Sequence, residues 1–356
     1  MSSSFAGTDP AGGEAGASQS TVVRLTDPSG VGEARRNAVT VGTRAGLDGN
    51  ALSNLSIVVN ELASNAVRHG GGGVVLLRQL REDEPTGIEV LCIDRGPGMS
   101  DLAGCFRDGF STGGTMGTGL GAARRIAHAF DIFSAPGQGT VVVARIWGGA
   151  GKPTTRIPLG ALAVPAAGER ECGDGWAAVT DGTTTHVMLV DGLGHGAGAA
   201  AAARLAVRLF RERGTLPPPA MLELLHGGLR PTRGAAVAIA HIDAAGKQVR
   251  FAGVGNIAAR ILTDTGTRSL VSHNGIVGLH GVRTSEFTYP FSADAMLVMH
   301  SDGITGHWKH ETYPGFLRRD PAVAAALLYR DAERGRDDVS VLACRAATPS
   351  LGRVDR

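Results

Sequence analysis

The segment 60–65 reads N-E-L-A-S-N and places a glutamate and an asparagine four residues apart, at Glu61 and Asn65. Apolar residues at positions 52, 55, 58, 59, 62 and 66 recur at helical spacing, which predicts that both side chains lie on one face of a helix. An asparagine oxygen can bind Mg²⁺ while leaving most of the coordination to phosphate and water. A glutamate one turn earlier can accept a proton from an attacking hydroxyl group. The segment therefore indicates a helix that contributes to an ATP site.

Two glycine-containing segments follow in the order that such a site needs. D-R-G-P-G at 94–98 ends a predicted strand, and Asp94 can accept a hydrogen bond from an adenine amino group. G-T-G-L-G at 117–121 opens a predicted helix, whose N-terminal amides favour phosphate. Taken singly, E-x-x-x-N is more often a solvated helix face, and both glycine segments could be turns. All three in order, with G-Q-G-T following at 137–140, predict an ATP pocket.

The second half carries widely spaced aspartates, at Asp174, Asp191, Asp302, Asp337 and Asp338. Several of them end predicted strands, so carboxylates from distant segments can bracket two divalent ions. Two ions about 4 Å apart can generate a hydroxide for in-line attack on a phosphate. Hard oxygen ligands favour Mg²⁺ or Mn²⁺. An Asp-Gly pair taken alone marks an ordinary turn, but the joint order favours a metal-dependent phosphatase.

Length and composition predict two domains. A chain of 356 residues with 43% hydrophobic residues can bury two ordinary cores, and G-G-A-G at 148–151 is a natural boundary. Beyond that boundary we expect paired strands, with helices in consecutive pairs, which favours a layered domain of the α+β class. The expected division is a disordered tail over 1–19, a first domain over 20–147, a linker over 148–154, a second domain over 155–346 and a C-terminal tail over 347–356.

Charge and hydropathy narrow the classes of function. No apolar run approaches the roughly 20 residues needed to cross a bilayer, so no membrane association is expected. Net charge is +2 without a long Lys/Arg block, so no nucleic-acid binding is expected. The first twenty residues lack the basic start and apolar centre of a signal peptide, and the four cysteines show no C-x-x-C spacing. We therefore expect a cytoplasmic protein with reduced thiols.

Residues 20–147 resemble the GHKL (Bergerat-fold) ATPases and, among them, the RsbT-like serine/threonine kinases of the anti-sigma type. The likeness rests on the segments above, on D-G-F-S-T-G-G-T-M-G-T-G-L-G at 108–121 and on A-P-G-Q-G-T at 135–140. It implies Glu61 as catalytic base, Asn65 as ligand of Mg²⁺, Asp94 on adenine with support from Thr140, and a short lid over 111–115. The other implied nucleotide-binding residues are Gly96, Gly98, Gly113, Gly117, Thr118, Gly119 and Gly121.

Residues 155–345 resemble the SpoIIE/RsbX branch of the PPM-type serine/threonine phosphatases. F-A-G-V-G-N-I at 251–257 and N-G-I-V-G-L at 274–279 add to the spaced aspartates. The resemblance implies that Asp191 bridges two metal ions, that the Gly192 carbonyl is a ligand, and that Asp302 and Asp337 hold one ion. Asp174 is a further ligand, and Asp338 could exchange roles with Asp337. His195 either supports the ligands or donates a proton. No residue matches the phosphate-binding arginine of the larger eukaryotic-type members.

Together the two resemblances predict a Bergerat α/β sandwich followed by a PPM-type α-β-β-α sandwich. They imply an ATP- and Mg²⁺-dependent kinase of a STAS-domain partner, joined to a phosphatase with two Mn²⁺ or Mg²⁺ ions. Such a partner would be a stressosome scaffold or an anti-sigma-factor antagonist in sigma-factor or stress-response control. An alternative is a binding protein that sequesters a sigma factor or an output enzyme, beside a phosphatase that acts on its antagonist. A third is that one of the two sites is vestigial.

Overall fold

The fold was established from a computed structural model. It describes residues 19–80, 86–106, 119–149, 158–181, 184–279 and 281–346. Residues 19–149 and 158–346 are called the N-terminal half and the C-terminal half below. No helix within these ranges is both long enough and apolar enough to cross a membrane.

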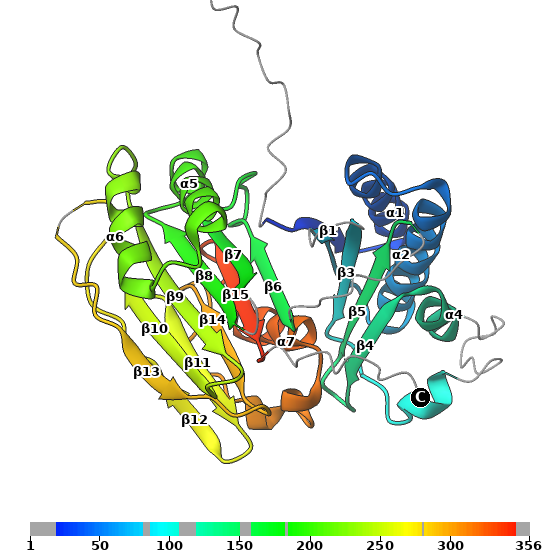
Figure 1. The fold of residues 1–356 in the computed structure, drawn as a ribbon. Helices are drawn as coiled ribbons and strands as arrows, with labels where there is room; N and C mark the ends of the chain where they lie inside the picture. The colour runs from blue at the N-terminus through cyan, green and yellow to red at the C-terminus, as the bar shows by residue number, and fades with distance from the viewer. Residues whose placement is uncertain are drawn as a thin grey trace, which may run out of the picture.

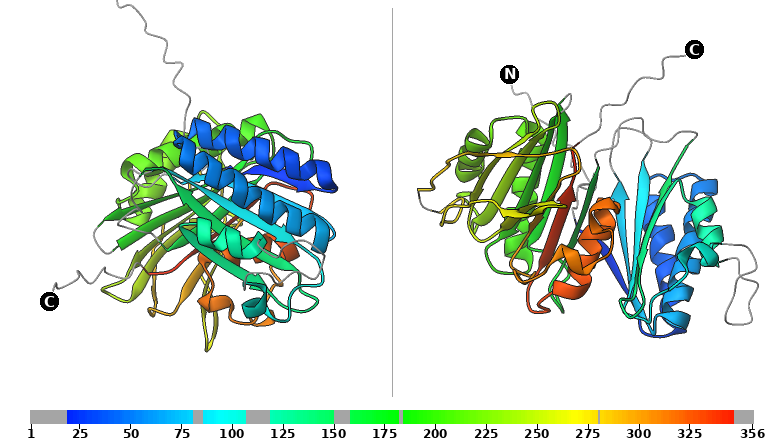
Figure 2. Two further views of the ribbon diagram at one scale, coloured as in Figure 1. Left: turned by 90° about the vertical axis from the view of Figure 1, so that its right-hand side faces the viewer. Right: turned by 90° about the horizontal axis from the view of Figure 1, so that it is seen from below.

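The N-terminal half is one antiparallel sheet with helices on one face (Figures 1 and 2). Its strand order is β1-β2-β3-β5-β4. The strands are β1 (Thr21–Leu25), β2 (Gly73–Leu80), β3 (Gly87–Asp94), β4 (Ala129–Ser134) and β5 (Thr140–Trp147). The helices are α1 (Pro28–Arg44), α2 (Gly49–His69), α3 (Leu102–Cys105) and α4 (Gly119–Ile126).

Aspartate caps set the start of the two long helices. Asp27 accepts a hydrogen bond from the Ser29 amide at 2.8 Å, and Asp48 accepts one from the Ala51 amide at 2.8 Å. Each satisfies an amide that has no partner within the helix. The helices then pack apolar residues, such as Leu55 and Leu62, against alternate residues of the sheet, such as Val75. The register of α2 agrees with the predicted pattern.

The C-terminal half contains two antiparallel sheets packed face to face. The first has the order β13-β10-β9-β8-β7 and the second has the order β12-β11-β14-β15-β6. The strands are β6 (Leu159–Val164), β7 (Asp174–Asp181), β8 (Thr184–Gly192), β9 (Ala235–Asp243), β10 (Gln248–Val254), β11 (Ala258–Thr263), β12 (Gly266–Ser269), β13 (Phe287–Pro290), β14 (Met296–His300) and β15 (Val339–Cys344). Helices α5 (Ala197–Arg213) and α6 (Pro218–Leu229) cover the first sheet, and α7 (Pro321–Ala332) covers the second (Figure 1). Two short 3-10 helices (His310–Thr312 and Phe316–Arg318) precede α7. This arrangement confirms the predicted α+β class and α-β-β-α sandwich.

Helix α7 is shared by both halves. One apolar cluster joins α7 residues, such as Leu327 and Leu328, to Val341 of the second sheet and to Leu76 and Val143 of the N-terminal sheet. The end-on view in Figure 2 shows α7, in orange, between the two bodies. A helix that is buried on nearly every side lies in the interior rather than on a surface. The face of the N-terminal sheet opposite α1 and α2 is therefore part of a core that both halves build.

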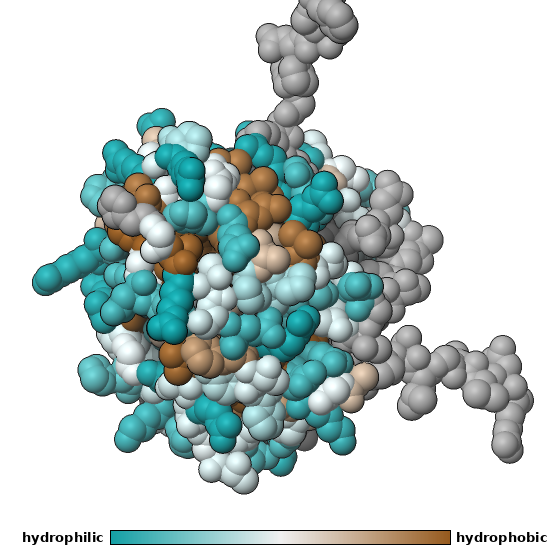
Figure 3. Space-filling model, turned by 60° about the vertical axis from the view of Figure 1, so that its left-hand side comes forward, coloured by the Kyte–Doolittle hydropathy of each residue, from teal (hydrophilic) through white to brown (hydrophobic). Residues whose placement is uncertain are grey.

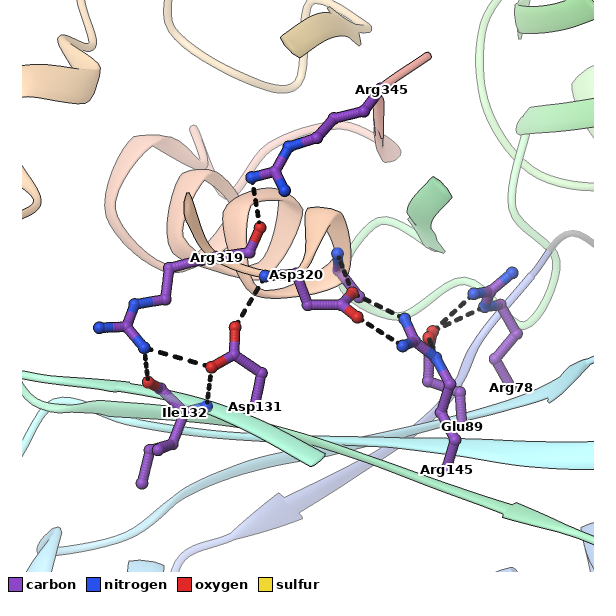
Figure 4. A network of polar contacts seen from close by, with 9 residues as sticks. Arg78, Glu89, Asp131, Ile132, Arg145, Arg319, Asp320 and Arg345 are labelled. Atoms are coloured by element: carbon purple, nitrogen blue, oxygen red, sulfur yellow. Dashed lines mark hydrogen bonds and ion pairs between the residues drawn. The ribbon is translucent and has the colours of Figure 1, made fainter. Parts of the chain in front are cut away.

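A network of buried charged side chains also joins α7 to the N-terminal sheet (Figure 4). Glu89 on β3 accepts hydrogen bonds from Arg78 at 2.6 Å and from Arg145 at 2.7 Å. Arg145 also binds both carboxylate oxygens of Asp320, which caps α7, at 2.6 and 2.8 Å. Asp131 on β4 accepts a hydrogen bond from the Asp320 amide at 2.7 Å. The start of α7 is thus attached to the N-terminal sheet by paired, desolvated groups.

Replacing Arg145 should cost most of the stability of this contact. Arg145→Met leaves the Asp320 carboxylate without its bidentate partner and Glu89, which is fully buried, with Arg78 alone. Removal of one partner of a buried ion pair costs roughly 3–5 kcal/mol because the remaining charge is uncompensated. Urea denaturation measures the loss, with Arg35→Met on the exposed face of α1 as the control. A loss below about 1 kcal/mol would show that the network contributes little.

A buried histidine pair makes the C-terminal half sensitive to acid. His186 on β8 and His241 on β9 are cross-strand partners, with ring centroids 4.1 Å apart, and both are buried. Burial lowers the pKa of both, and that of His241 falls to about 3, with the neighbouring His186 and Arg250 as further causes. Among described residues, Asp181 acts in the opposite direction on His186, and Glu286 lies 3.8 Å from Arg250.

The unfolded chain takes up these protons near pH 6.5 but the folded chain does not, so stability is complete above that pH and falls as the pH drops towards 3. Between pH 7.5 and pH 5 we expect the wild type to lose about 2 kcal/mol more than His241→Phe, which keeps a ring at this position and cannot titrate. Denaturation curves at several pH values test this. Parallel profiles for the two proteins would contradict it.

Some details of the structure differ from the pattern of the sequence. The pattern that begins at 117–121 predicts a helix as far as residue 130, but α4 ends at Ile126, because Phe130 pairs with Ala144 in the sheet. Strands β12 and β13 were not predicted, since they are four-residue edge strands with little burial. The sequence predicts a strand over 156–164, and β6 spans Leu159–Val164, while residues 151–157 lie outside the described ranges.

Candidate active sites

The predicted ATP site has its two chemical residues on the C-terminal part of α2. Glu61 and Asn65 are half-buried and one turn apart. Gly119, the first residue of α4, lies against both of them: a Cβ atom on Gly119 would be 2.9 Å from Glu61 Oε2 and 3.7 Å from Asn65 Oδ1. A side chain there would displace the end of the Glu61 side chain, so the glycine lets α4 approach α2 while Glu61 keeps this position. The structure therefore brings the start of the predicted phosphate helix beside the predicted base and the predicted magnesium ligand.

Asp94 lies at the end of β3 and is held by main-chain amides. Its Oδ1 atom accepts hydrogen bonds from Gly96 N at 2.9 Å and from Thr140 N at 3.0 Å. Burial raises the pKa of Asp94 above its usual value, while these hydrogen bonds act in the opposite direction. Thr140 comes from the next strand in the sheet, so the predicted support of Asp94 by Thr140 agrees with the geometry. An oriented carboxylate at this position can accept a hydrogen bond from a base amino group.

The other predicted nucleotide residues fall into two groups. Gly98 has φ +69°, and a Cβ atom there would clash with the Ala135 carbonyl, so glycine lets the 94–99 loop pack on the turn after β4. Gly121 is buried within α4. Gly113, Gly117, Thr118 and the proposed lid over 111–115 lie outside the described residues.

The predicted metal residues gather at one edge of the C-terminal sandwich. Asp174 and Asp191 are cross-strand partners at the ends of β7 and β8, and Gly192 N donates to Gly173 O at 2.9 Å. Asp302 follows β14, and Asn256 donates to its Oδ2 atom at 2.8 Å. Gly192 is buried, so its carbonyl belongs to the same edge as Asp191.

The negative charges of these carboxylates repel one another and raise each other's pKa. Burial is the largest cause that raises the pKa of Asp191, and the charges of Asp174, Asp302 and the pair 337–338 add to it, giving a value of about 9 in all. Burial likewise raises the pKa of Asp174 to about 7, and its Oδ2 atom is buried and accepts no hydrogen bond from a described residue. Buried, mutually repelling carboxylates are stabilised by a cation. The donor set therefore fits hard divalent ions such as Mg²⁺ or Mn²⁺.

The proposed metal ligands are spread apart in the structure. Within the described ranges, no three His, Cys, Asp or Glu side chains converge on one point as ligands of a single ion. Mg²⁺ keeps several water ligands and uses only one or two carboxylates, so a spread set of aspartates is compatible with it.

Asp337 and Asp338 differ clearly. Asp338 is buried, and its two oxygens accept hydrogen bonds from the amides of Ala166 at 2.8 Å and Gly173 at 2.9 Å. Asp337 is exposed and lines a hollow together with Asp302. The geometry favours Asp337 as the ligand and Asp338 as the residue that ties the loops together.

Sequence reasoning missed several residues at this edge. One of them is Glu169, which no motif indicated. Its Oε1 atom lies 2.8 Å from Nδ1 of His195, which is exposed. Asn256 belongs to the segment F-A-G-V-G-N-I, which was recognised for its likeness to a family rather than for its contact with Asp302. Arg334 and Arg336 line the same hollow as Asp302 and Asp337. Their position directly before Asp337 in R-G-R-D-D was the available signal.

Comparison with known proteins assigns each half separately. Residues 25–146 match the model of the histidine kinase-like ATPase domain, and residues 181–347 match that of stage II sporulation protein E (SpoIIE). The chain joins a histidine kinase-like ATPase domain to a SpoIIE domain. The first is called the kinase-like domain below and the second the SpoIIE domain.

Several known proteins are similar to parts of this chain. The serine/threonine-protein kinase RsbT of Bacillus subtilis (strain 168) is 29% identical over 125 residues, which are 35% of this chain and 94% of that protein. A chain from a solved structure of the bacterial stressosome is 26% identical, with a TM-score of 0.50, covering 53% of this chain and all of that chain. RsbX in complex with magnesium is 17% identical with a TM-score of 0.44, covering 52% of this chain and 93% of that one.

Proposed function

We propose that this chain is a bifunctional regulator that adds phosphate to a protein partner with one domain and removes it with the other. The kinase-like domain would phosphorylate serine or threonine, and the SpoIIE domain would hydrolyse the same kind of phosphoester. The proposal is supported by two separate groups of chemically suited residues: Glu61, Asn65 and Asp94 in one domain, and the carboxylates around Asp191 in the other.

In the kinase-like domain, Glu61 would take the proton of the attacking hydroxyl group, and Asp94 would orient the adenine. Asn65 would hold Mg²⁺, which neutralises phosphate charge when bound. The contact of Gly119 with both α2 residues supports this assignment, because it brings helix N-terminal amides next to them. The likeness to RsbT supports a protein substrate rather than a small molecule.

In the SpoIIE domain, Asp191, Asp302 and Asp337 would hold divalent ions, with Asp174 and the Gly192 carbonyl close by. Such ions, when bound, lower the pKa of water and neutralise the leaving oxygen. Exposed leucines support a protein substrate here as well. Leu193, two residues after Asp191, and Leu279 are both exposed, and both lie beside Gly234. Figure 3 shows hydrophobic areas among hydrophilic side chains on one side of the molecule. Exposed apolar groups around a polar site favour a protein partner.

The likenesses to RsbT and to a stressosome chain support a STAS-domain protein as the shared partner, within a cytoplasmic stress-response or sigma-factor circuit. Incubation with a STAS-domain protein and labelled ATP tests this. Transfer of label to serine or threonine in Mg²⁺, and its release when Mn²⁺ is added, is the expected result. Tight stoichiometric binding without transfer would favour the alternative, sequestration of a sigma factor or an output enzyme.

A further inference from the structure

A hollow of about 420 Å³ opens beside the proposed metal residues. It is lined by two carboxylates, Asp302 and Asp337, and by two arginines, Arg334 and Arg336. The carboxylates belong to the metal set described above, whereas the arginines have no role in it. Guanidinium groups repel cations, so metal binding does not explain why two arginines lie beside these carboxylates.

Main-chain hydrogen bonds hold the arginines next to the carboxylates. Arg334 N donates to Gly303 O at 2.9 Å, directly after Asp302. Two residues after Gly303, Thr305 N donates at 2.8 Å to the carbonyl of Ala332, which lies two residues before Arg334. Gly335 has φ +70°, which turns the chain between the two arginines. The segment 333–336 therefore starts at the rigid end of α7 and stays fixed against the Asp302 loop.

The two guanidinium groups are free to bind a ligand. Within the described ranges, neither forms a side-chain hydrogen bond or an ion pair within 4 Å. Burial and the charge of Asp337 raise the pKa of Asp302, and the charge of Arg334 acts in the opposite direction. Other arginines of the chain, such as Arg145, use their donors on carboxylates. Arg334 and Arg336 keep theirs available at the mouth of the hollow.

We propose that Arg334 and Arg336 bind the phosphoryl group of the phosphorylated substrate. The proposal rests on the phosphatase activity proposed above. A guanidinium group matches the oxygens of a phosphate dianion with paired, charge-assisted hydrogen bonds. Asp302 and Asp337 alone would repel such a dianion, and the arginines offset that repulsion from the open side. This supplies the anion recognition for which the sequence offers no counterpart of the arginine in eukaryotic-type phosphatases.

Substitution tests the proposal with inorganic phosphate and a phosphoserine peptide as probes. With Mn²⁺ present, Arg334→Gln and Arg336→Gln should each raise the KM for the peptide and the inhibition constant of inorganic phosphate by about 10-fold. The effect on kcat should be smaller, and lysine at either position should restore part of the loss. Arg268→Gln, on exposed strand β12 and outside the hollow, serves as the matched control.

Manganese binding separates this role from a structural one. Removing a positive charge should leave Mn²⁺ affinity unchanged or increase it, as followed by calorimetry. Weaker Mn²⁺ binding together with an unchanged phosphate constant would overturn the proposal, because the arginines would then only orient the carboxylates. If the wild type hydrolyses no phosphopeptide, the proposed phosphatase function fails. In that case, calorimetry of inorganic phosphate binding to the Mn²⁺-loaded protein still tests whether the two arginines bind phosphate. Equal phosphate affinity in the wild type and the variants would contradict this role.

Discussion

Asp191→Asn should abolish phosphate removal and leave phosphate transfer intact. Asp191 is the carboxylate on which the others act most, since Asp174, Asp302 and the pair 337–338 all raise its pKa. An amide in its place keeps the shape but cannot neutralise divalent ions, so we expect a loss of at least about 100-fold in hydrolysis. Hydrolysis of a phosphothreonine peptide in Mn²⁺ measures it, with Asp264→Asn, on the exposed turn between β11 and β12, as the control.

The same variant should change stability in a direction that a damaged fold would not. Without metal, the buried Asp191 carboxyl destabilises the folded chain at pH 7, because the unfolded chain ionises it freely. Asp191→Asn should therefore raise the unfolding free energy of the metal-free protein by on the order of 2 kcal/mol. It should also remove the stabilisation that Mn²⁺ gives the wild type. Thermal denaturation with and without Mn²⁺ checks both. A variant that is less stable without metal and still stabilised by Mn²⁺ would contradict the assignment.

Glu61→Gln should abolish phosphate transfer while ATP still binds. Glu61 lies one turn before Asn65 and beside Gly119, and it is the carboxylate placed to take a proton at that point. General-base catalysis contributes typically 10²–10⁴-fold, so the transfer rate should fall by at least about 100-fold. Labelled transfer to the partner measures this, and fluorescence of a nucleotide analogue measures ATP binding.

Glu33→Gln, on the exposed side of α1, is the matched control for Glu61→Gln. Phosphatase activity should be unchanged in both variants, because the Asp191 edge belongs to the other domain. Near-normal transfer by Glu61→Gln would remove Glu61 from the role of base. Loss of ATP binding in this variant would show that Glu61 acts on the nucleotide itself.

The sequence predicted the elements whose signals are local. The start of α1 was predictable because Asp27, Pro28 and Ser29 together form an N-cap and first turn. The helix carrying Glu61 and Asn65 was predictable from apolar spacing, because one face of α2 packs on the sheet. The gathering of the distant aspartates was predictable from their positions at strand ends, since adjacent strands deliver them to one edge.

Other features depend on tertiary contacts and left no local signal. The segment of α7 reads like any apolar helix, and only the structure shows that it packs on two sheets at once. Asp337 and Asp338 have the same chemistry, and they are distinguished only by the amides of distant Ala166 and Gly173. The position of Arg334 and Arg336 next to Asp302 is visible only in the structure, where they line the same hollow.

We propose that the two domains add phosphate to, and remove it from, the same residue of a partner protein. Mass spectrometry of a STAS-domain partner, incubated with ATP and each variant, tests it most directly. Asp191→Asn should bring one serine or threonine to nearly full phosphorylation, and the wild type should hold the same residue at a lower steady level. Glu61→Gln, added afterwards without ATP, should remove phosphate from that residue. Phosphate that remains there, in the presence of Mn²⁺ and a Glu61→Gln protein active on other phosphopeptides, would contradict the claim.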